Sequence, residues 1–165
     1  MDEQTGVYAE IDLLDVNQVV TQQVLRFQEY AQTQAVALEE RLFDEPVLVC
    51  MSRQSLEEIV GNLIENAIRY NCENGRVCIS TGRVGDKAEI TVADTGIGIA
   101  PIDQLRIFER FYRADASRSK QTGGTGLGLA IVKHAIQAAG GTVSVDSTLG
   151  KGSTFVVQLP AAIVE

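Results

Sequence analysis

Apolar residues recur at helical spacing in three segments of the chain, residues 16–35, 52–68 and 126–139. Steps of three and four residues between apolar positions predict amphipathic helices. Ser52 can cap the second helix with its hydroxyl. The pair Gly140-Gly141 is typical of a helix end and marks where the third helix stops. We therefore expect three main helices, each with one buried face.

Shorter apolar runs between these segments predict strands separated by turns. The predicted strands cover residues 8–14, 36–43, 47–51, 76–83, 87–93, 142–146 and 154–159. Turn residues predict hairpins at 44–46, 85–86 and 149–152, and Pro101 is expected to open a short helical piece as far as Phe108. Helices and hairpins alternate irregularly, so we predict an α+β fold: a two-layer sandwich with the helices on one face of a mixed sheet.

Composition places the chain among ordinary globular domains. Its 165 residues suffice for one domain, and 45% are hydrophobic and 22% charged. The apolar runs are too short for a membrane span, and Met1 is followed by acidic residues, not by a basic leader, so we expect a soluble chain without an export signal. The net charge of −8 argues against nucleic acid or an anionic membrane as a partner.

The chain contains three cysteines, Cys50, Cys72 and Cys78. An odd number without a CxxC pair fits neither a disulfide framework nor a zinc site. We expect Cys50 and Cys78 to be small buried apolar residues, and the cysteine usage indicates a reducing, cytosolic compartment.

Polar side chains form a stripe on the second predicted helix. Asn62, Asn66 and Arg69 are separated by four and three residues and therefore share a helix face. Carboxamide oxygens suit a hard cation and a guanidinium suits phosphate. A solvated polar face would explain the same residues, so the stripe alone does not decide between these alternatives.

Two glycine-rich segments follow. Asp94-Thr95-Gly96-Ile97-Gly98 comes at the end of a predicted strand, where a carboxylate can accept a hydrogen bond from an amine and glycine lets the backbone approach a flat ring. Gly123 to Gly128 leads directly into the third helix, where free N–H groups and the helix dipole favour an anion. It lacks the lysine of a P-loop and has no Rossmann unit around it. Each segment alone could be a turn or a hinge.

Taken together and in this order, these segments resemble the N, G1 and G2 boxes of the catalytic ATP-binding domain of sensor histidine kinases, of the phosphate-regulon-sensor-like type. Phe108-Glu109-Arg110-Phe111-Tyr112-Arg113 is similar to the F box of the same family, and Gly150 to Phe155 to its closing hairpin. The resemblance implies the Bergerat fold, shared with gyrase-type and MutL-type ATPases, with a mobile ATP lid at residues 114–124.

The resemblance also implies roles for individual residues. Asn66 would hold Mg²⁺ with Asn62 beside it, Arg69 would meet phosphate, and these three would be the catalytic residues. Tyr70 would pack near the sugar or base, and Asp94 would take the adenine amine. The remaining residues expected to contact ATP are Gly96, Gly98, Ile99, Arg113, Lys120, Gly124, Thr125, Gly126, Leu127, Gly128, Leu129 and Thr154. Mg²⁺ would offset the phosphate charge, so the negative total is no barrier to ATP.

The same family needs a phosphoacceptor histidine. His134 is the one histidine of the chain, and it follows the glycine loop inside the third helix without the acidic neighbour of the acceptor motif. We expect it to be a surface or half-buried helix residue. The resemblance therefore implies a catalytic domain that donates the γ-phosphoryl of ATP to a histidine on a separate dimerisation domain, and the isolated chain is not expected to phosphorylate itself.

Three alternatives differ in chemistry. Gyrase-type and MutL-type ATPases carry a glutamate as general base where this chain has Asn62, an amide that cannot take a proton. Serine-kinase relatives also tend to have an acid there. A nucleotide sensor without transfer activity is the third alternative.

The resemblance also bears on boundaries and partners. It covers residues 7–160, which leaves residues 1–6 as a disordered or vector-derived segment and residues 161–165 as a tail. The expected partners are the phosphoacceptor domain and, indirectly, a response regulator. The fragment would be monomeric and would lie on the cytosolic side of a membrane-anchored protein.

Overall fold

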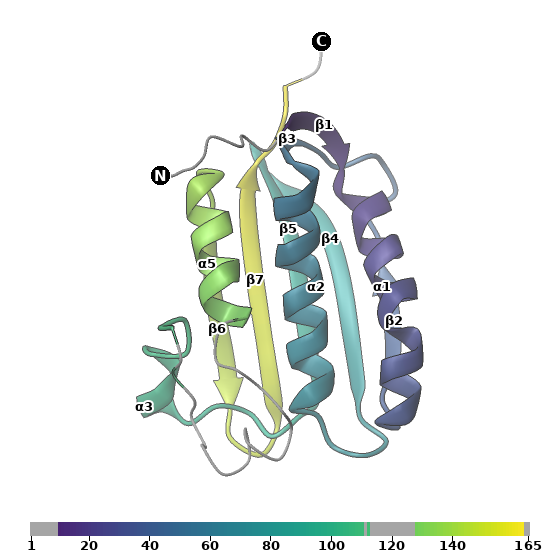
Figure 1. The fold of residues 1–165 in the computed structure, drawn as a ribbon, viewed down its shortest axis with the longest axis vertical. Coiled ribbons are helices and arrows are strands. Elements are labelled where there is room, and N and C mark those ends of the chain that lie inside the picture. Colours follow the sequence, from purple (N-terminus) through teal and green to yellow (C-terminus); the bar gives the residue numbers. More distant parts are fainter. Residues whose placement is uncertain (1–9, 111, 113–127, 164–165) are drawn as a thin grey trace.

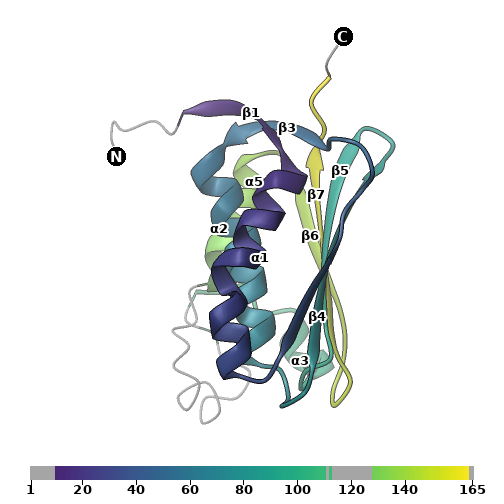
Figure 2. The same cartoon turned by 90° about the vertical axis from the view of Figure 1, so that its right-hand side faces the viewer.

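The computed structural model describes residues 10–110, 112 and 128–163, which form a two-layer sandwich. Figure 2 shows the helices in one layer and the sheet in the other. The helices are α1 (Val16–Thr33), α2 (Arg53–Arg69) and α5 (Gly128–Ala138), with a short α3 (Pro101–Gln104) apart from them (Figure 1). The predicted α+β sandwich, with its three main helices on one face, is confirmed.

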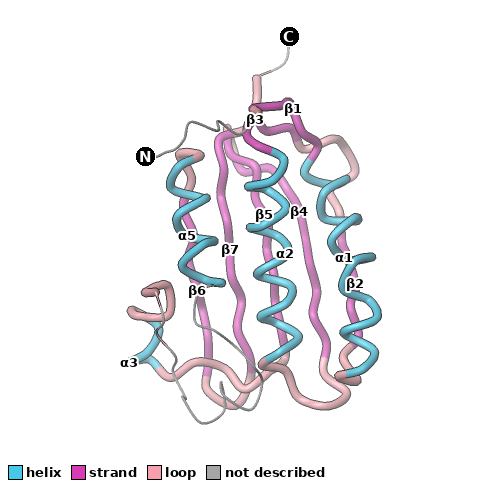
Figure 3. The backbone as a smooth tube through the Cα atoms, viewed as in Figure 1, coloured by secondary structure: helices cyan, strands magenta, loops and turns pink. Residues whose placement is uncertain are grey.

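The main sheet has five strands in the order β2-β4-β5-β7-β6 (Figure 3). The strands are β2 (Ala37–Arg41), β4 (Arg76–Val84), β5 (Lys87–Asp94), β6 (Thr142–Thr148) and β7 (Gly152–Pro160). β4 pairs with β5 and β6 with β7 in antiparallel hairpins, as their turns predict. β2 runs parallel to β4, so the sheet is mixed.

The hairpin predicted for residues 36–43 and 47–51 is wrong. β3 (Leu48–Ser52) pairs instead with β1 (Ile11–Asp15) in a separate two-stranded sheet. The connecting loop is held by other elements: Asn17 Nδ2 donates to the carbonyls of Phe43 and Glu45, at 3.1 Å each, and Phe43 N–H donates to Thr81 Oγ1 at 2.8 Å. These long-range hydrogen bonds lead the chain away from β2.

The core lies between the helices and the sheet. Alternate residues of β4, β5 and β7, such as Ile79, Ile90 and Val157, are fully buried against α1, α2 and α5. No described helix covers the opposite side of the sheet, as is usual for sheets rich in antiparallel pairs. Cys78 is only half-buried there, and Cys50 is exposed on β3, so the prediction that Cys50 is buried is wrong. Cys50 alternates with the buried Val49 and Met51, which take the core side.

The start of α2 and the end of α5 follow their sequence signals, and a further cap stands at the start of α1. Asp15 caps α1 by accepting from Asn17 N–H, and Ser52 caps α2 by accepting from Ser55 N–H. After α5, Gly140 has a φ of +81°, and the N–H of Gly141 donates to Ile136 O at 2.9 Å, the arrangement that commonly closes a helix at glycine. Within the described residues, no helix is both long and apolar enough to cross a membrane.

The predicted tail is fastened at its described part. Ala161 N–H donates to Asp86 O at 2.9 Å, and Ala162 N–H donates to Leu48 O at 2.8 Å. Residues 161–163 therefore run against the β4–β5 turn and β3. Residues 1–9 lie outside the described residues.

Gly141 gives a test of how tightly α5 and β6 are joined to β7. A Cβ at Gly141 would lie 2.2 Å from Gln158 O, whereas a Cβ at Gly82 would meet nothing within 4 Å. We expect Gly141→Ala to lower the free energy of unfolding by about 2 kcal/mol, because the backbone must shift to admit the methyl group. Gly82→Ala, the matched control, should stay within about 0.5 kcal/mol. Urea titration of both variants measures this, and equal midpoints would contradict the packing described.

Candidate functional site

Segments far apart in the sequence meet at one end of the sandwich, the lower end in Figure 1. These are the C-terminal end of α2, the loop after β5 and the β6–β7 turn. The first turn of α5 lies above that end, beside the middle of α2. The end of α2 contacts the loop after β5 directly, since Ile97 N–H donates to Tyr70 O at 3.1 Å. The loop in turn contacts the β6–β7 turn, where Gly150 N–H donates to Ile97 O at 2.7 Å.

Asp94 is the last residue of β5 and has a fixed side chain. Its Oδ1 accepts hydrogen bonds from Gly96 N–H at 2.9 Å and from Ser153 N–H at 3.2 Å. Burial raises the pKa of Asp94 above the ordinary value of an aspartate, and the two backbone hydrogen bonds oppose this by lowering it. A half-buried carboxylate with one oxygen held by the backbone has its other oxygen left for a ligand amine.

Glycines permit the close packing around Asp94. A Cβ at Gly96 would lie 2.4 Å from Tyr70 O, and a Cβ at Gly98 would lie 2.2 Å from Thr148 O. Gly152 is on the neighbouring strand β7, one residue before the partner of Asp94, and has a φ of +126°. A Cβ added there would lie 2.0 Å from Asp94 O. Any other residue at these positions would push the three segments apart.

The polar stripe of α2 lies next to this loop. Asn62, Asn66 and Arg69 are half-buried on the helix, as their spacing predicts. Asn62 Nδ2 donates to Glu58 O at 2.7 Å. A Cβ at Gly128, the first residue of α5, would lie 3.2 Å from Asn62 Oδ1. The start of α5 therefore packs directly over Asn62.

Asn66 and Arg69 each carry polar atoms that have no partner among the described residues. Within the described residues, the Asn66 carboxamide forms no hydrogen bond. Arg69 Nη2 pairs with Glu65 Oε2 at 3.3 Å, while its Nε is buried with no partner among the described residues. Buried polar atoms without partners are uncommon and can indicate a missing ligand.

The carboxamide of Asn66 fits a divalent cation that takes most of its ligands from elsewhere. No group of three or more histidine, cysteine, aspartate or glutamate side chains within the described ranges could hold a metal ion. A protein cage for Mg²⁺ is thus not found in that part of the chain. Mg²⁺ at nucleotide sites is usually held by one or two protein oxygens together with phosphates.

The structure places the other expected contacts as follows. Ile99 is half-buried in the loop after β5, and its N–H donates to Ser147 Oγ at 2.8 Å. Leu129 packs against the hydrophobic core, so its side chain supports α5. Six of the expected contacts lie outside the described residues: Arg113, Lys120, Gly124, Thr125, Gly126 and Leu127.

Thr154 is not on the side of the sheet that carries Asp94. Its backbone pairs with Ala93, and alternation along β7 turns its side chain to the uncovered face. Ser153, its neighbour, pairs with Asp94 and is buried. The residue of β7 that contacts Asp94 is therefore Ser153, and the alternation of Phe155, Val157 and Leu159 toward the core could have indicated this from the sequence.

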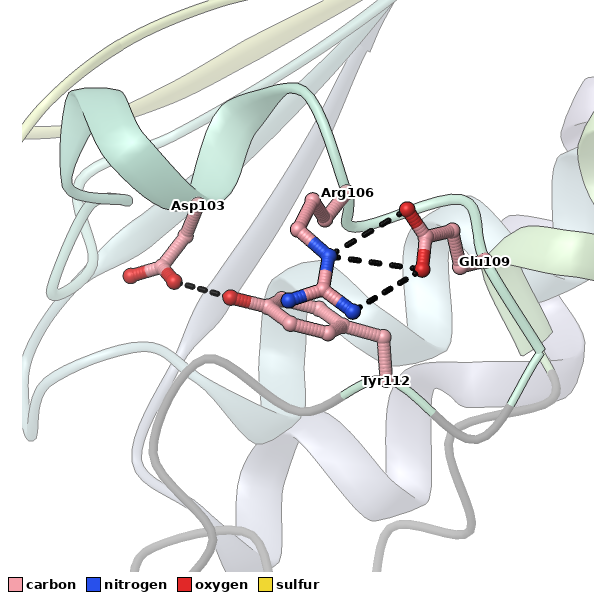
Figure 4. Close-up of polar contacts among 4 residues, drawn as sticks. All are labelled: Asp103, Arg106, Glu109 and Tyr112. Atoms are coloured by element: carbon pink, nitrogen blue, oxygen red, sulfur yellow. Dashed lines mark hydrogen bonds and ion pairs between the residues drawn. The ribbon is translucent and has the colours of Figure 1, made fainter.

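The segment resembling the F box forms a compact cluster after α3 (Figure 4). Arg106 pairs with Glu109 at 3.2 Å and lies over the ring of Tyr112, 4.5 Å from its centroid. The Tyr112 hydroxyl hydrogen-bonds to Asp103 on α3, which raises the pKa of Tyr112. Beside this cluster, Phe108 packs edge-to-face on Phe155, with ring centroids 6.2 Å apart. The segment is thereby fixed to α3 and to β7.

Sequence comparison identifies the family. Residues 51–163 match the family described as histidine kinase-, DNA gyrase B- and HSP90-like ATPases. The sensor-like histidine kinase SenX3 of Mycobacterium tuberculosis is 55% identical over 104 residues, which are 63% of this chain and 25% of that protein. The sensor histidine kinase RppB of Synechocystis is 45% identical over 145 residues, 88% of this chain and 32% of that protein. The chain thus spans about a quarter to a third of the length of these relatives.

Comparison with solved structures also finds histidine kinases. The mycobacterial sensor histidine kinase MprB superposes with a TM-score of 0.82 at 28% identity, over 93% of this chain and all of that one. Full-length ShkA in complex with AMPPNP superposes with a TM-score of 0.83 at 27% identity, over 97% of this chain and 33% of that one.

The matched relatives favour the sensor kinase interpretation over the gyrase-type and MutL-type alternatives. Together with the loop and helix geometry around Asp94, these matches show that the chain belongs to the family of histidine kinase-, DNA gyrase B- and HSP90-like ATPases, as a catalytic ATPase domain of the sensor histidine kinase type.

Proposed function

We propose that this chain binds Mg²⁺-ATP and donates the γ-phosphoryl group to a histidine on a separate phosphoacceptor segment. The observation that carries the proposal is the half-buried Asp94 carboxylate, held by Gly96 and Ser153 at the meeting point of three segments. A matched structure contains AMPPNP, an ATP analogue, which supports a nucleotide at this site.

Adenine would be recognised by Asp94 in a slot that the chain has already built. One carboxylate oxygen is occupied by two backbone N–H groups, so the other can accept from the adenine amine. Gly96 and Gly98 keep the loop close to Tyr70 and Thr148 and leave no side chain of their own in the slot. Binding a flat ring here costs little reorganisation, because hydrogen bonds already fix the loop.

The phosphates would lie along the stripe of α2. Asn66 Oδ1 would ligate Mg²⁺, and the Arg69 guanidinium, whose Nε has no partner among the described residues, would meet a phosphate oxygen. Bound Mg²⁺ supplies charge neutralisation for the triphosphate. Gly128 would add the N-terminal dipole of α5 beside Asn62.

Transfer is favoured over hydrolysis by the residue at position 62. In the transfer, the bond between the γ-phosphorus and the bridging oxygen breaks, ADP leaves with the electron pair, and a bond to an imidazole nitrogen forms. Positioning and electrostatics carry most of such a reaction. Asn62 has no proton-accepting group, and its amide is engaged with Glu58 O, so no general base for water stands at this point of α2.

The acceptor would come from outside this chain. His134 is exposed on α5 and is the one histidine of the chain. We propose that the acceptor belongs to a helical dimerisation domain, and that a response regulator then receives the phosphoryl group. The domain would work on the cytosolic side of a membrane-anchored protein, where ATP is available.

Asp94→Asn separates nucleotide binding from folding. The Asn carboxamide can still accept from Gly96 and Ser153, but it loses the charge that strengthens a hydrogen bond to the adenine amine. We expect the Kd for ADP, measured by calorimetry, to rise at least about tenfold. Asp12→Asn on exposed β1 is the control and should bind as the unaltered chain does. Unchanged ADP affinity in Asp94→Asn would contradict the assignment.

Asp94→Asn should weaken nucleotide binding, but the raised pKa of Asp94 predicts that the same variant is more stable toward unfolding. Because the folded pKa lies above the unfolded value of about 3.9, ionised Asp94 opposes folding at neutral pH. The cost is absent below the unfolded pKa and develops as the pH rises through the folded pKa. Asp94→Asn should therefore unfold at higher urea than the unaltered chain at pH 7, with the difference shrinking as the pH falls toward 4. A difference independent of pH would contradict this.

Asn66→Ala tests the cation separately from the base. Removing one oxygen ligand should weaken Mg²⁺-dependent ATP binding about tenfold, while ADP binding in EDTA should change little. Gln54→Ala, exposed on the first turn of the same helix, is the control. An equal loss with and without Mg²⁺ would argue against a ligand role for Asn66.

The reaction itself is tested by mixing the chain with radiolabelled ATP and a separately purified dimerisation domain of a SenX3-type relative. We expect acid-labile, alkali-stable label on that domain and none when its acceptor histidine is changed to glutamine. Steady phosphate release without any acceptor, at a rate comparable to transfer, would favour the gyrase-type alternative.

A further inference from the structure

A network of side-chain hydrogen bonds lies behind the predicted adenine slot, and neither the sequence motifs nor the proposed function includes it. Ser147 is near the end of β6, on the same face of the strand as Val143 and Val145, which pack against the core. Gln104 is the last residue of α3. Both residues are half-buried.

The Ser147 hydroxyl connects the two segments that define the slot. Its oxygen accepts from Ile99 N–H at 2.8 Å, on the loop that follows Asp94. It also lies 2.9 Å from Gly152 O and 2.7 Å from Ser153 Oγ, on the strand whose backbone holds Asp94. The hydroxyl is therefore the shared partner of both sides of the slot.

The hydrogen-bonding capacity of Ser147 is fully used. A hydroxyl has one proton to donate and two lone pairs. Gly152 O can only accept, so Ser147 donates to it, and Ser147 then accepts from Ile99 N–H and from the Ser153 hydroxyl. An alanine at 147 would remove the hydrogen-bonding partner that Ile99 N–H, Gly152 O and the Ser153 hydroxyl share in this half-buried region.

Gln104 also holds the backbone of Ile99, through the carbonyl and not the N–H group. Its Nε2 donates to Ile99 O at 2.8 Å and to Ser147 O at 3.1 Å. Both partners are carbonyl oxygens, so only the amino end of the carboxamide can face them. The backbone of Ile99 is thus held at its N–H by Ser147 and at its carbonyl by Gln104.

We propose that Ser147 and Gln104 are positioning residues for adenine recognition: they set the separation between the loop at Ile99 and the strand at Ser153, and through Ser153 the placement of the Asp94 carboxylate. This inference rests on the proposed function. Neither residue has to touch the nucleotide, because each acts on the backbone groups that shape the slot. Their loss should widen the slot and leave the phosphate stripe of α2 unchanged.

The experiment compares Ser147→Ala with a matched control, Ser144→Ala, which removes an exposed hydroxyl from the same strand. We expect Ser147→Ala to raise the Kd for ADP and the KM for ATP in the phosphotransfer assay about tenfold. The kcat should stay within about twofold, because binding away from the reacting atoms is lost equally in the ground and transition states. Ser144→Ala should equal the unaltered chain in both constants.

A conservative variant and a second site guard against a purely structural effect. Ser147→Thr keeps the hydroxyl and should restore most of the affinity. Gln104→Glu keeps the shape but places a carboxylate against two carbonyls, and should raise KM at least as much as Ser147→Ala. Gln104→Ala combined with Ser147→Ala should cost less than the two single changes together, because both act on Ile99. Urea midpoints identify any variant that fails to fold.

Two results would overturn the inference. One is an unchanged KM in folded Ser147→Ala and Gln104→Glu. The other is a fall in kcat with KM preserved, since that would place the effect on transfer and not on adenine. Failure of the unaltered chain to bind ADP would instead overturn the proposed function, and this inference with it.

Discussion

Close approach of three backbone segments at Asp94 is the constraint on which the rest of the site depends. The end of α2, the loop after β5 and the β6–β7 turn come so near one another that a Cβ at Gly96, Gly98 or Gly152 would overlap a neighbouring carbonyl oxygen. Because the segments touch through their backbones, the N–H groups of Gly96 and Ser153 can both hold the half-buried carboxylate of Asp94. Contacts between backbone segments therefore determine the shape of the site and fix the position of the Asp94 side chain.

The local make-up of the proposed site explains how a negatively charged chain could bind a negatively charged nucleotide. A chain with a net charge of −8 is an unfavourable partner for a polyanion at long range. Locally, however, the proposed phosphate contacts come from the Asn66 carboxamide, the Arg69 guanidinium and the start of α5. Burial raises the pKa of Asp94 and makes its charge costly for the fold. The proposed adenine contact would explain why the chain keeps an energetically unfavourable group at this position, as functional sites often do.

Local patterns predicted the fold well where the contacts are local. Helical spacing located α1, α2 and α5, with Ser52 marking the start of α2 and Gly140-Gly141 the end of α5, and short turns located the β4–β5 and β6–β7 hairpins. Pairing of β2 with β4 and of β3 with β1 depends on residues distant in the sequence, such as Asn17 and Thr81, and the apparent turn at residues 44–46 led to a wrong hairpin. Periodicity within one segment contains no information about which strand lies beside it.

The residues of the candidate site also fall into those that a local motif could predict and those that only the fold brings together. Glycines and the aspartate form recognisable motifs, so the loop after β5 could be predicted as a unit. Ser147 and Gln104 could not, because a serine in a strand and a glutamine in a short helix are ordinary until the fold brings them to Ile99. Thr154, expected near adenine, lies on the other face of β7 from Ser153, because successive side chains of a strand alternate between the two faces of the sheet.

In the proposed site, the Asp94 carboxylate recognises adenine by accepting a hydrogen bond from its amine. Calorimetry of the unaltered chain with ADP and with inosine diphosphate, which has a carbonyl in place of that amine, tests it most directly. The account predicts that inosine diphosphate binds at least about tenfold more weakly, because its carbonyl faces a carboxylate. Equal affinity for the two nucleotides would contradict it.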